Sequence, residues 1–371
     1  MKTNNQKNVL LAIAALSGTI IGAGFFSLPY IITQVGVWVL LAYFLVLGGL
    51  VLLIHLLLAE VALRTPDFLR LPGYAQVHLG EKGRYAALIS IVFGGYGSML
   101  AYLIIGGSFL QQIMSPVLGG GNLAYTLVYF LLGGFLLYLG IRPMAKICFF
   151  ELAVFSGLLV LFAVFGKELF NANNLIGQPS LKNAFLPYGP VLFSLWGAAM
   201  IPEVEEMLGE GKKNLKKVVI ISVVLAAVVY LLFALIVAGI SGKATTIDGI
   251  SGLIGLLGPG IVIFGLFVGI VTTFTSFVAL GLTVEKVLTY DFKIPRMWAL
   301  ALACFAPLVM YLLGFNNFLK VISFVGAGMM GLEGVLILAM YYKIKGKKVF
   351  IYPLMVVLLG GFIYELVNFL K

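Results

Sequence analysis

Runs of about twenty apolar residues constrain the fold of this chain more than any other feature. A membrane-spanning helix needs about 20 consecutive, mostly apolar residues. Only 10% of the 371 residues are charged and 62% are hydrophobic, whereas a chain that folds in water keeps about 25% charged. Eleven such runs follow one another: 9–31, 36–62, 84–114, 123–141, 145–166, 187–208, 215–240, 258–290, 297–314, 319–342 and 349–370. We therefore predict an all-α polytopic membrane protein of about 11 transmembrane helices with a lipid bilayer around it.

The lysines and arginines are distributed unevenly over the connections between these runs. If the N-terminus is cytoplasmic and the runs alternate, the outer side holds only Lys167, Lys182, Lys243, Lys320 and Lys371 out of 24 basic residues. Cytoplasmic loops carry such an excess of basic residues. We predict a multi-pass protein of the cell membrane with its N-terminus in the cytoplasm and its C-terminus outside. Because the basic residues lie in short loops, the net charge of +10 predicts no nucleic-acid partner.

Two of the runs carry a matched interruption. Gly24 precedes Pro29 by five residues in the first run, and Gly197 precedes Pro202 by the same spacing in the sixth. Glycine weakens a helix and proline removes a backbone donor. Each interruption opens a set of five spans, and five is odd, so the sets have opposite orientations, as in an inverted repeat with broken helices. We predict one transporter domain over 1–371, with repeat one at about 9–166, repeat two at about 187–342 and an extra helix at about 349–370.

Broken helices of this kind can bind both ends of a zwitterion. A half-helix that starts in the membrane offers free N–H groups and a positive dipole end to a carboxylate. A half-helix that ends there offers free carbonyl groups to a cation. Glycine and proline are common in membrane helices, so one interruption alone would carry little weight. Two matched interruptions predict a substrate site at the first and sixth spans.

The residues around the first interruption resemble a known family. Gly18-Thr19-Ile20-Ile21-Gly22-Ala23-Gly24, followed by Leu28-Pro29, resembles the first-helix signature of the amino acid/auxin permease family, within the amino acid/polyamine/organocation superfamily and nearest to the bacterial hydroxy/aromatic amino acid permeases. Weaker matches follow in the same order along the chain: Ala101-Tyr102 with Gly106-Gly107-Ser108, Pro202-Glu203-Val204 and Thr275-Ser276-Phe277. The resemblance implies a five-plus-five inverted repeat of the leucine-transporter type, and amino-acid transport coupled to protons or sodium.

The same resemblance implies roles for individual residues. The substrate would bind at Gly22, Ala23, Gly24, Tyr102, Phe193, Ser194, Trp196 and Gly197. The carbonyls of Gly18 and Ile21 and the hydroxyls of Thr275 and Ser276 would bind a cation. Some relatives carry a lysine on the fifth span in place of sodium, and here 150–164 contains no lysine.

Ionisable residues inside membrane spans are expensive and are functional candidates. Glu151 and Glu203 are the candidate proton carriers. Each also has a structural interpretation: Glu151 as an ion pair with Lys146, and Glu203 as a partner of the lysines in 212–217. Glu333 on the tenth run faces the same two interpretations, and no neighbouring residue decides between them.

The remaining features argue against an enzyme. His55 and His78 have no metal-ligand spacing, and no zinc-protease, nucleophile-elbow or P-loop motif occurs. We expect no cofactor and no metal beyond a coupling ion, sodium or proton. The predicted function is cation-coupled symport of a neutral, aromatic or hydrophobic amino acid by a monomer with alternating access. An uncoupled exchanger or facilitator, and an amino-acid sensor with a transporter-like fold, remain the alternatives.

Overall fold

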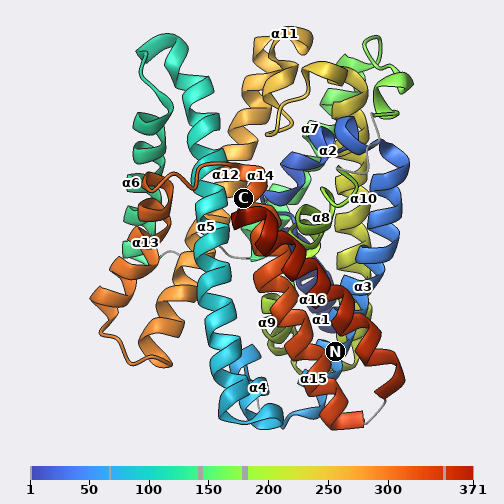
Figure 1. The fold of residues 1–371 in the computed structure, drawn as a ribbon, viewed down its shortest axis with the longest axis vertical. Coiled ribbons are helices and arrows are strands. Elements are labelled where there is room, and N and C mark those ends of the chain that lie inside the picture. Colours follow the sequence, from blue (N-terminus) through green and yellow to red (C-terminus); the bar gives the residue numbers. More distant parts are fainter. Residues whose placement is uncertain (1, 67, 141–144, 178–182, 346–347, 371) are drawn as a thin grey trace.

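The fold is a bundle of helices with two interrupted spans near its centre (Figure 1). The computed structural model describes residues 2–66, 68–140, 145–177, 183–345 and 348–370, and all regular elements in these ranges are helical. The side chains of 2–5, 7, 145–149, 348–350 and 370 lie outside the description. The predicted contact between Glu151 and Lys146 therefore falls outside the described side chains. The prediction of an all-helical chain is confirmed.

The first half of the chain supplies the first interrupted span and the helices that follow it. Its elements are α1 (Lys2–Ile20), η1 (Gly24–Ser27), α2 (Leu28–Val35), α3 (Val37–Arg64), α4 (Leu71–Leu79), α5 (Glu81–Leu118), α6 (Asn122–Leu139), α7 (Ala145–Gly166) and η2 (Ala172–Leu175). The short helix α4 lies in a stretch that was expected to be a connection.

The second half of the chain begins with the second interrupted span. Its elements are α8 (Tyr188–Leu195), η4 (Ala198–Met200), α9 (Ile201–Leu208), η5 (Gly209–Asn214), α10 (Leu215–Ser241), η6 (Gly242–Ala244), η7 (Ser251–Leu253), α11 (Ile254–Leu257), α12 (Pro259–Tyr290), α13 (Arg296–Leu312), α14 (Phe318–Phe324), η8 (Val325–Met330), α15 (Gly331–Lys345) and α16 (Lys348–Leu370). The element η8 is a π-helix that joins α14 to α15.

Among the described residues, seven helical segments are long and apolar enough to cross a membrane, or eight if the bent pair α1–α2 is one span. One of the seven, Tyr188–Ala244, contains α8, α9 and α10 together, and Phe150–Gly166 and Arg296–Leu312 are shorter apolar helices. Each of the eleven predicted apolar runs overlaps one or more of the helices given above. The total of eleven membrane crossings, and the domain and repeat boundaries, stay predictions.

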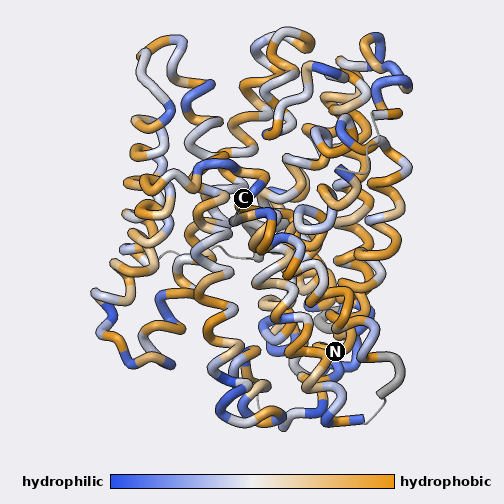
Figure 2. The backbone as a smooth tube through the Cα atoms, in the orientation of Figure 1, coloured by the Kyte–Doolittle hydropathy of each residue, from blue (hydrophilic) through white to orange (hydrophobic). Residues whose placement is uncertain are grey.

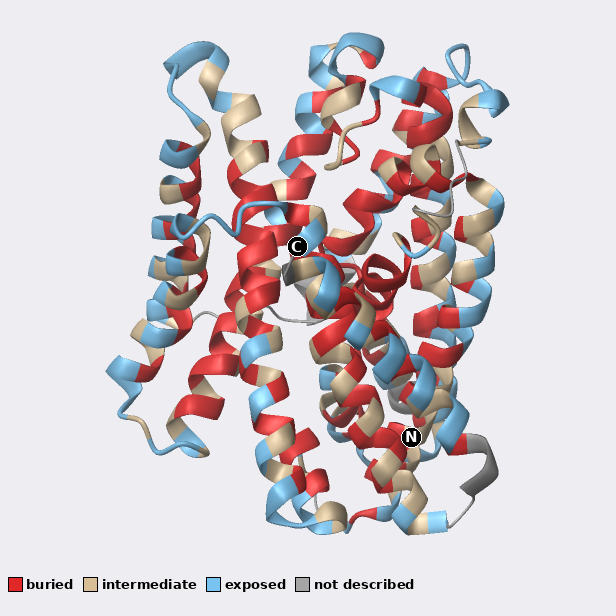
Figure 3. Cartoon of the chain, in the orientation of Figure 1, coloured by how far each residue is buried: buried red, intermediate tan, exposed pale blue. Residues whose placement is uncertain are grey.

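The exterior of the bundle is apolar along much of its length. Large hydrophobic side chains such as Trp38, Leu45 and Leu131 are exposed on it, and hydrophilic residues gather toward the two ends (Figure 2). Buried residues occupy the centre, where the interrupted spans lie (Figure 3). Lipid is the medium that suits such an exterior, because a polar solvent would leave a large apolar area hydrated.

Basic residues that the charge distribution assigns to the cytoplasm form ion pairs at one end of the bundle. Glu60 on α3 accepts from Lys216 of α10 at 2.6 Å and from Lys345 of α15 at 2.7 Å. Arg84 of α5 pairs with Asp291 after α12 at 3.1 Å. The loops predicted to be cytoplasmic therefore lie at the same end of the bundle. That this end faces the cytoplasm stays a prediction.

Candidate functional site

The first break lies between α1 and α2. The helix α1 ends at Ile20, three residues without helical structure follow, and the 3-10 turn η1 leads into α2, whose axis is bent by 49° from that of α1. Pro29 occupies the first turn of α2, where its missing N–H costs nothing. The unwound segment therefore lies at 21–23, just before the predicted stretch, and Gly24 to Pro29 forms the 3-10 turn and the new helix start.

Unwinding changes the backbone hydrogen bonds of the first break. The N–H of Gly22, which a continuous helix would direct to Gly18, bonds the Ile20 carbonyl instead at 2.7 Å. The amides of Ala23 and Gly24 donate no hydrogen bond among the described residues. Two N–H groups and the Gly18 carbonyl are thus left free at the centre of a membrane protein, where unpaired backbone groups mark a cavity or a binding site.

The second break repeats this geometry between α8 and α9. The helix α8 ends at Leu195, two residues follow without helical structure, and the 3-10 turn η4 leads into α9 with Pro202 in its first turn. Here the freed amide has a partner, because the Gly197 N–H donates to Nε2 of His55 on α3 at 3.1 Å. The indole N–H of Trp196 donates to the carboxylate of Glu333 on α15 at 2.7 Å.

The two breaks are in direct contact. A Cβ atom added at Gly24 would lie 2.6 Å from the Ser194 hydroxyl and 2.7 Å from the ring of Phe193. A Cβ atom added at Gly197 would lie 2.6 Å from the Ile20 side chain. The glycines therefore let two unwound backbones approach more closely than any side chain would allow. The residues proposed for the substrate from both breaks come together.

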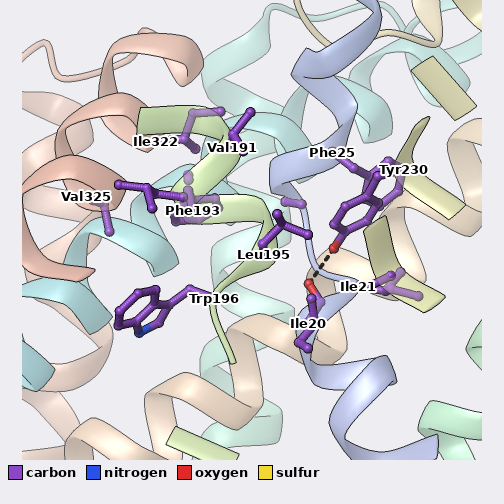
Figure 4. Close-up of a cluster of buried hydrophobic side chains, with 14 of the residues drawn as sticks. Ile20, Ile21, Phe25, Val191, Phe193, Leu195, Trp196, Tyr230, Ile322 and Val325 are labelled. Carbon is purple, nitrogen blue, oxygen red and sulfur yellow. Dashed lines mark hydrogen bonds between the residues drawn. The ribbon is translucent and has the colours of Figure 1, made fainter. Parts of the chain in front are cut away.

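Tyr230 of α10 joins the two breaks from one side. Its hydroxyl lies 2.5 Å from the Ile20 carbonyl at the end of α1 and 3.1 Å from the Ser194 carbonyl near the end of α8. Figure 4 shows this ring stacked beside Phe25 with its hydroxyl aimed at Ile20. One buried hydroxyl thus links carbonyls from both half-helices; the Ile20 carbonyl also accepts the Gly22 N–H, whereas the Ser194 carbonyl has no other donor among the described residues.

The helices α5 and α12 face the first break from the other side. The Tyr102 hydroxyl of α5 lies 3.0 Å from a Cβ added at Gly22 and interacts with the Ser276 side chain of α12. Thr275, which precedes Ser276 on α12, donates to the Glu151 carboxylate of α7 at 2.6 Å. The structure therefore brings Tyr102, Ser276 and Thr275 near one another, and it adds Glu151 to the hydroxyl pair.

Glu151 also lies close to the first break through its own helix. One turn further along α7, the Phe155 ring packs on Phe25 of η1 with centroids 4.6 Å apart. The helix α7 packs against both α1 and α12. The candidate proton carrier thus contacts the Thr275 hydroxyl of α12 and lies one turn from a residue that packs on the first break. No ion pair of Glu151 occurs among the described side chains.

Glu203, the second candidate proton carrier, lies away from this group. It accepts from the Nε of Arg70 at 2.8 Å in an exposed ion pair. Its partner is therefore an arginine before α4 rather than a lysine of 212–217. Nearby, burial and the Glu205 carboxylate raise the pKa of the Tyr74 hydroxyl on α4, which stays a donor to Glu205.

Three residues that contact the breaks were not among the predicted site residues. His55 was set aside because it has no metal-ligand spacing, Tyr230 lies in an ordinary apolar run, and Glu333 had no neighbour to decide its role. A lone ionisable residue within an apolar run is the only sequence signal for His55 and Glu333. For Tyr230 no signal exists, because tyrosine is common in membrane helices.

The chain matches a family of known transporters. The profile of the tryptophan/tyrosine permease family covers residues 5–370, so the chain belongs to this family. The amino acid/auxin permeases, which the sequence motifs resemble, are a related transporter family. The resemblance therefore identified a related family of transporters but not the family itself.

One curated relative, tyrosine-specific transport system 1 of Haemophilus influenzae, is 25% identical over 230 residues, which are 61% of this chain and 56% of that protein. The match thus spans about half the length of that relative.

Solved structures confirm the fold. MhsT in complex with L-phenylalanine superposes with a TM-score of 0.65 at 16% identity, over 97% of this chain and 98% of that one. Mhp1, a nucleobase-cation-symport-1 family transporter with bromovinylhydantoin bound, gives a TM-score of 0.62 at 14% identity, over 93% and 80%. The chain therefore has the leucine-transporter type of fold. It is a multi-pass membrane protein, and its family is one of transporters rather than of enzymes.

Proposed function

We propose that this member of the tryptophan/tyrosine permease family carries a neutral aromatic amino acid across the cell membrane by proton-coupled symport. The family description, the tyrosine-specific relative and the phenylalanine bound to a structural neighbour all support an aromatic amino acid. The N-terminus lies in the cytoplasm and the C-terminus outside, as the excess of basic residues on one side favours.

One observation carries this proposal: two free amides lie where the two breaks touch. The N–H groups of Ala23 and Gly24 start the half-helix η1–α2, and their positive dipole end attracts a carboxylate. The free carbonyl of Gly18 accepts from the substrate amine or a coupling cation. Ser194 and Phe193 face Gly24 from the second break and contact the rest of the substrate.

The residues beside this contact favour an uncharged substrate side chain. Tyr102, Phe193 and Phe25 bring aromatic rings to the breaks, and each is buried. Aromatic rings pack well on one another at centroid distances of about 4.5–7 Å. A charged side chain would need a partner of opposite charge there. The geometry therefore favours tyrosine, tryptophan or phenylalanine over a charged amino acid.

The proton is the coupling ion that the contacts of Thr275 favour. Its hydroxyl lies 2.6 Å from the Glu151 carboxylate, which has no described ion-pair partner. A carboxylate without a cation is costly inside a membrane, and a bound proton removes that cost. When Glu151 binds a proton from outside, the outward-open state can close around the substrate. Release to the cytoplasm then resets the carrier.

Movement follows from the way the breaks are packed. We expect the spans that carry α1–α2, α3, α8–α9 and α10 to rock as one bundle against α5, α6, α12 and α13. The substrate then sees each side of the membrane in turn, because the site lies between the bundle and α5 and α12. A monomer is sufficient for this cycle, since both breaks belong to one chain.

Transport into proteoliposomes tests the proposal. Labelled tyrosine, tryptophan and phenylalanine are offered under a pH gradient alone and a sodium gradient alone. We expect accumulation under the pH gradient, and Glu151→Gln should lose accumulation while it retains exchange. The control is Glu168→Gln, which replaces an exposed carboxylate after α7 that pairs with Lys167; this variant should transport normally.

Other outcomes would replace the proposal. Accumulation driven only by sodium would assign a cation site to the carbonyls of Gly18 and Ile21 and the hydroxyls of Thr275 and Ser276. Exchange without accumulation under either gradient would make the protein an uncoupled exchanger. No uptake of any amino acid by folded protein would favour a sensor.

A further inference from the structure

Glu333 is a buried carboxylate whose main contact is the second break. It lies on α15, and its side chain accepts the Trp196 indole N–H at 2.7 Å. Trp196 is the first residue after α8, so this bond holds the point where the helix unwinds. The neighbouring Gly197 amide is held by His55, whose ring lies 5.4 Å from the Trp196 ring. The second break is therefore pinned by two ionisable side chains.

The segments α14 and η8, which precede α15 and Glu333 in the chain, pack closely on α8. A Cβ atom added at Gly189 of α8 would lie 2.5 Å from Cα of Ser323. The π-helix η8 starts directly after this contact, and Figure 4 shows Val325 at its start facing Phe193 of α8. A π-helix leaves a carbonyl without its usual partner, and here the Ser90 hydroxyl of α5 donates to the Met329 carbonyl at 2.8 Å. Backbone contact and the Trp196–Glu333 bond thus join the two broken regions of the second repeat.

The surroundings of Glu333 contain little that could neutralise a carboxylate. The elements packed against α15 are α3, α4, α5, α16 and η8. Their described charged or titratable side chains are Tyr43, His55, Glu60 and Arg64 on α3, Tyr74 and His78 on α4, Glu81, Lys82, Arg84, Tyr85, Tyr96 and Tyr102 on α5, and Tyr352, Tyr364 and Glu365 on α16. Among the described residues, no cation pairs with Glu333.

His55 is the titratable group that shares these contacts, and it is neutral. Its Nε2 accepts the Gly197 N–H, which a doubly protonated imidazolium could not do. Next to Glu333, the side chains that meet Gly334 are Leu358, Ile54 and Trp196. The carboxylate is therefore held by neutral donors in apolar surroundings, an arrangement that makes its charge costly.

We propose that Glu333 is a second proton-binding residue, which holds the second break through Trp196 when it is charged and frees it when it is protonated. A hydrogen bond from an indole N–H to a carboxylate is roughly twice as strong as one to a neutral acid. Protonation therefore weakens the link between α15 and the break, and the bundle can move past α15. This inference rests on the proposed transport cycle and adds a positioning residue to it.

The tryptophans of this chain allow a test that needs no substrate. The chain has three tryptophans, and Trp38 and Trp298 are exposed on the bundle surface. The double variant Trp38→Phe/Trp298→Phe leaves Trp196 as the only tryptophan, and excitation at the red edge of the indole band selects it over the tyrosines. Because its N–H is bonded to Glu333, its emission should change in one step over roughly pH 5–9 in liposomes.

Four variants in this background decide the source of the step. Glu333→Gln should remove it, because the amide does not titrate. Glu365→Gln, the matched control, replaces another buried carboxyl, which lies on α16 near Tyr188 and forms no hydrogen bond with Trp196 or Gly197 among the described residues; this variant should keep the step. Glu333→Asp keeps an acid but shortens its reach, and it should shift the step if Glu333→Gln does not fold. A flat profile in the background protein, or a step that survives Glu333→Gln and disappears in His55→Gln, would overturn the proposal.

Exchange of labelled amino acid at equal pH on both sides provides the second measurement. In the Glu151→Gln background, where the other proposed proton carrier no longer titrates, we expect the exchange rate to vary with pH and to lose that dependence when Glu333→Gln or Trp196→Phe is added. The double variant should behave like either single variant, since both changes break one bond. If the starting protein transports no amino acid, the proposed function fails while the fluorescence step still decides on Glu333. If it transports and the Glu333→Gln pH profile is unchanged, the inference fails alone.

Discussion

The two breaks have the same backbone plan and different surroundings. At the first break, Phe25 packs among the rings of Phe155, Tyr230 and Phe233, and the amides of Ala23 and Gly24 stay free. At the second break, His55 holds the Gly197 amide and Glu333 holds the Trp196 indole. One break is enclosed by apolar rings and the other by ionisable side chains.

This difference assigns different tasks to the two breaks. Free amides beside apolar rings offer a carboxylate strong donors without a competing protein partner. Amides already occupied by a side chain cannot bind the substrate, but the bonds that occupy them can be made and broken. The first break is therefore suited to recognition and the second to control of movement. The predictions below probe this division, beginning with the largest expected effect.

Separating the breaks should have the largest effect. Gly24→Val places a side chain within 2.6 Å of the Ser194 hydroxyl and 2.7 Å of Phe193. Overpacking of this kind costs about 1–3 kcal/mol, and it also covers the free amides. Uptake of labelled tyrosine should fall more than about tenfold, because each 1.4 kcal/mol corresponds to tenfold. Gly49→Ala on α3 meets no atom within 4 Å and serves as the control; normal uptake by Gly24→Val would contradict contact between the breaks.

Removing the hydroxyl that joins the breaks should come next. Tyr230→Phe removes the shared donor, so the Ser194 carbonyl is left unpaired while the Ile20 carbonyl keeps the Gly22 N–H. An unpaired buried polar group costs about 1–3 kcal/mol, so both thermal stability and uptake should decrease. Tyr43→Phe removes a comparable bond, to the Ala184 carbonyl, away from the breaks. It should lower the melting temperature without slowing uptake, and equal uptake by the two variants would refute a special role for Tyr230.

The second break should respond to loss of His55. His55→Leu leaves the Gly197 N–H buried without an acceptor, which costs about 1–3 kcal/mol. If this break governs movement, the maximal rate should decrease while the substrate affinity at the first break stays the same. Binding of labelled tyrosine by scintillation proximity measures the affinity separately. A large loss of affinity with an unchanged rate would reverse the division of tasks.

The smallest effect is expected at Glu203. Its exposed ion pair with Arg70 contributes about 0–1 kcal/mol, and it lies outside the contacts between the breaks. Glu203→Gln and Arg70→Gln should therefore have the same slight effect on proton-driven uptake. If Glu203→Gln abolishes accumulation and Arg70→Gln does not, then Glu203 carries a proton and the coupling site extends to α9.

Much of the architecture follows from local sequence signals. The apolar runs and the spacing of Gly24 to Pro29 and Gly197 to Pro202 predicted where helices form and where two of them unwind. These features are local, because a run of apolar residues specifies a helix in lipid, and glycine and proline act on their own backbone. The matched position of both breaks after five spans predicted that they belong to one site.

The partners of the site residues could not be predicted in the same way. Thr275 was expected to contact a cation, and its hydroxyl contacts Glu151, which is 124 positions away. Trp196 was expected at the substrate, and its indole N–H reaches Glu333, 137 positions away. Such pairs depend on how each helix is rotated and tilted in the bundle. Alternative packings of apolar helix faces differ little in energy, so the local sequence does not specify one rotation and tilt.

The sequence by itself determined that this chain forms membrane helices, which two of them break and which residues lie at the breaks. Each of these properties depends on neighbours within one or two turns. Only the tertiary structure decided that the amides of Ala23 and Gly24 remain free while the Gly197 amide is taken by His55. A hydrogen bond between distant helices forms only when packing brings donor and acceptor to about 3 Å, and packing is a property of the whole bundle.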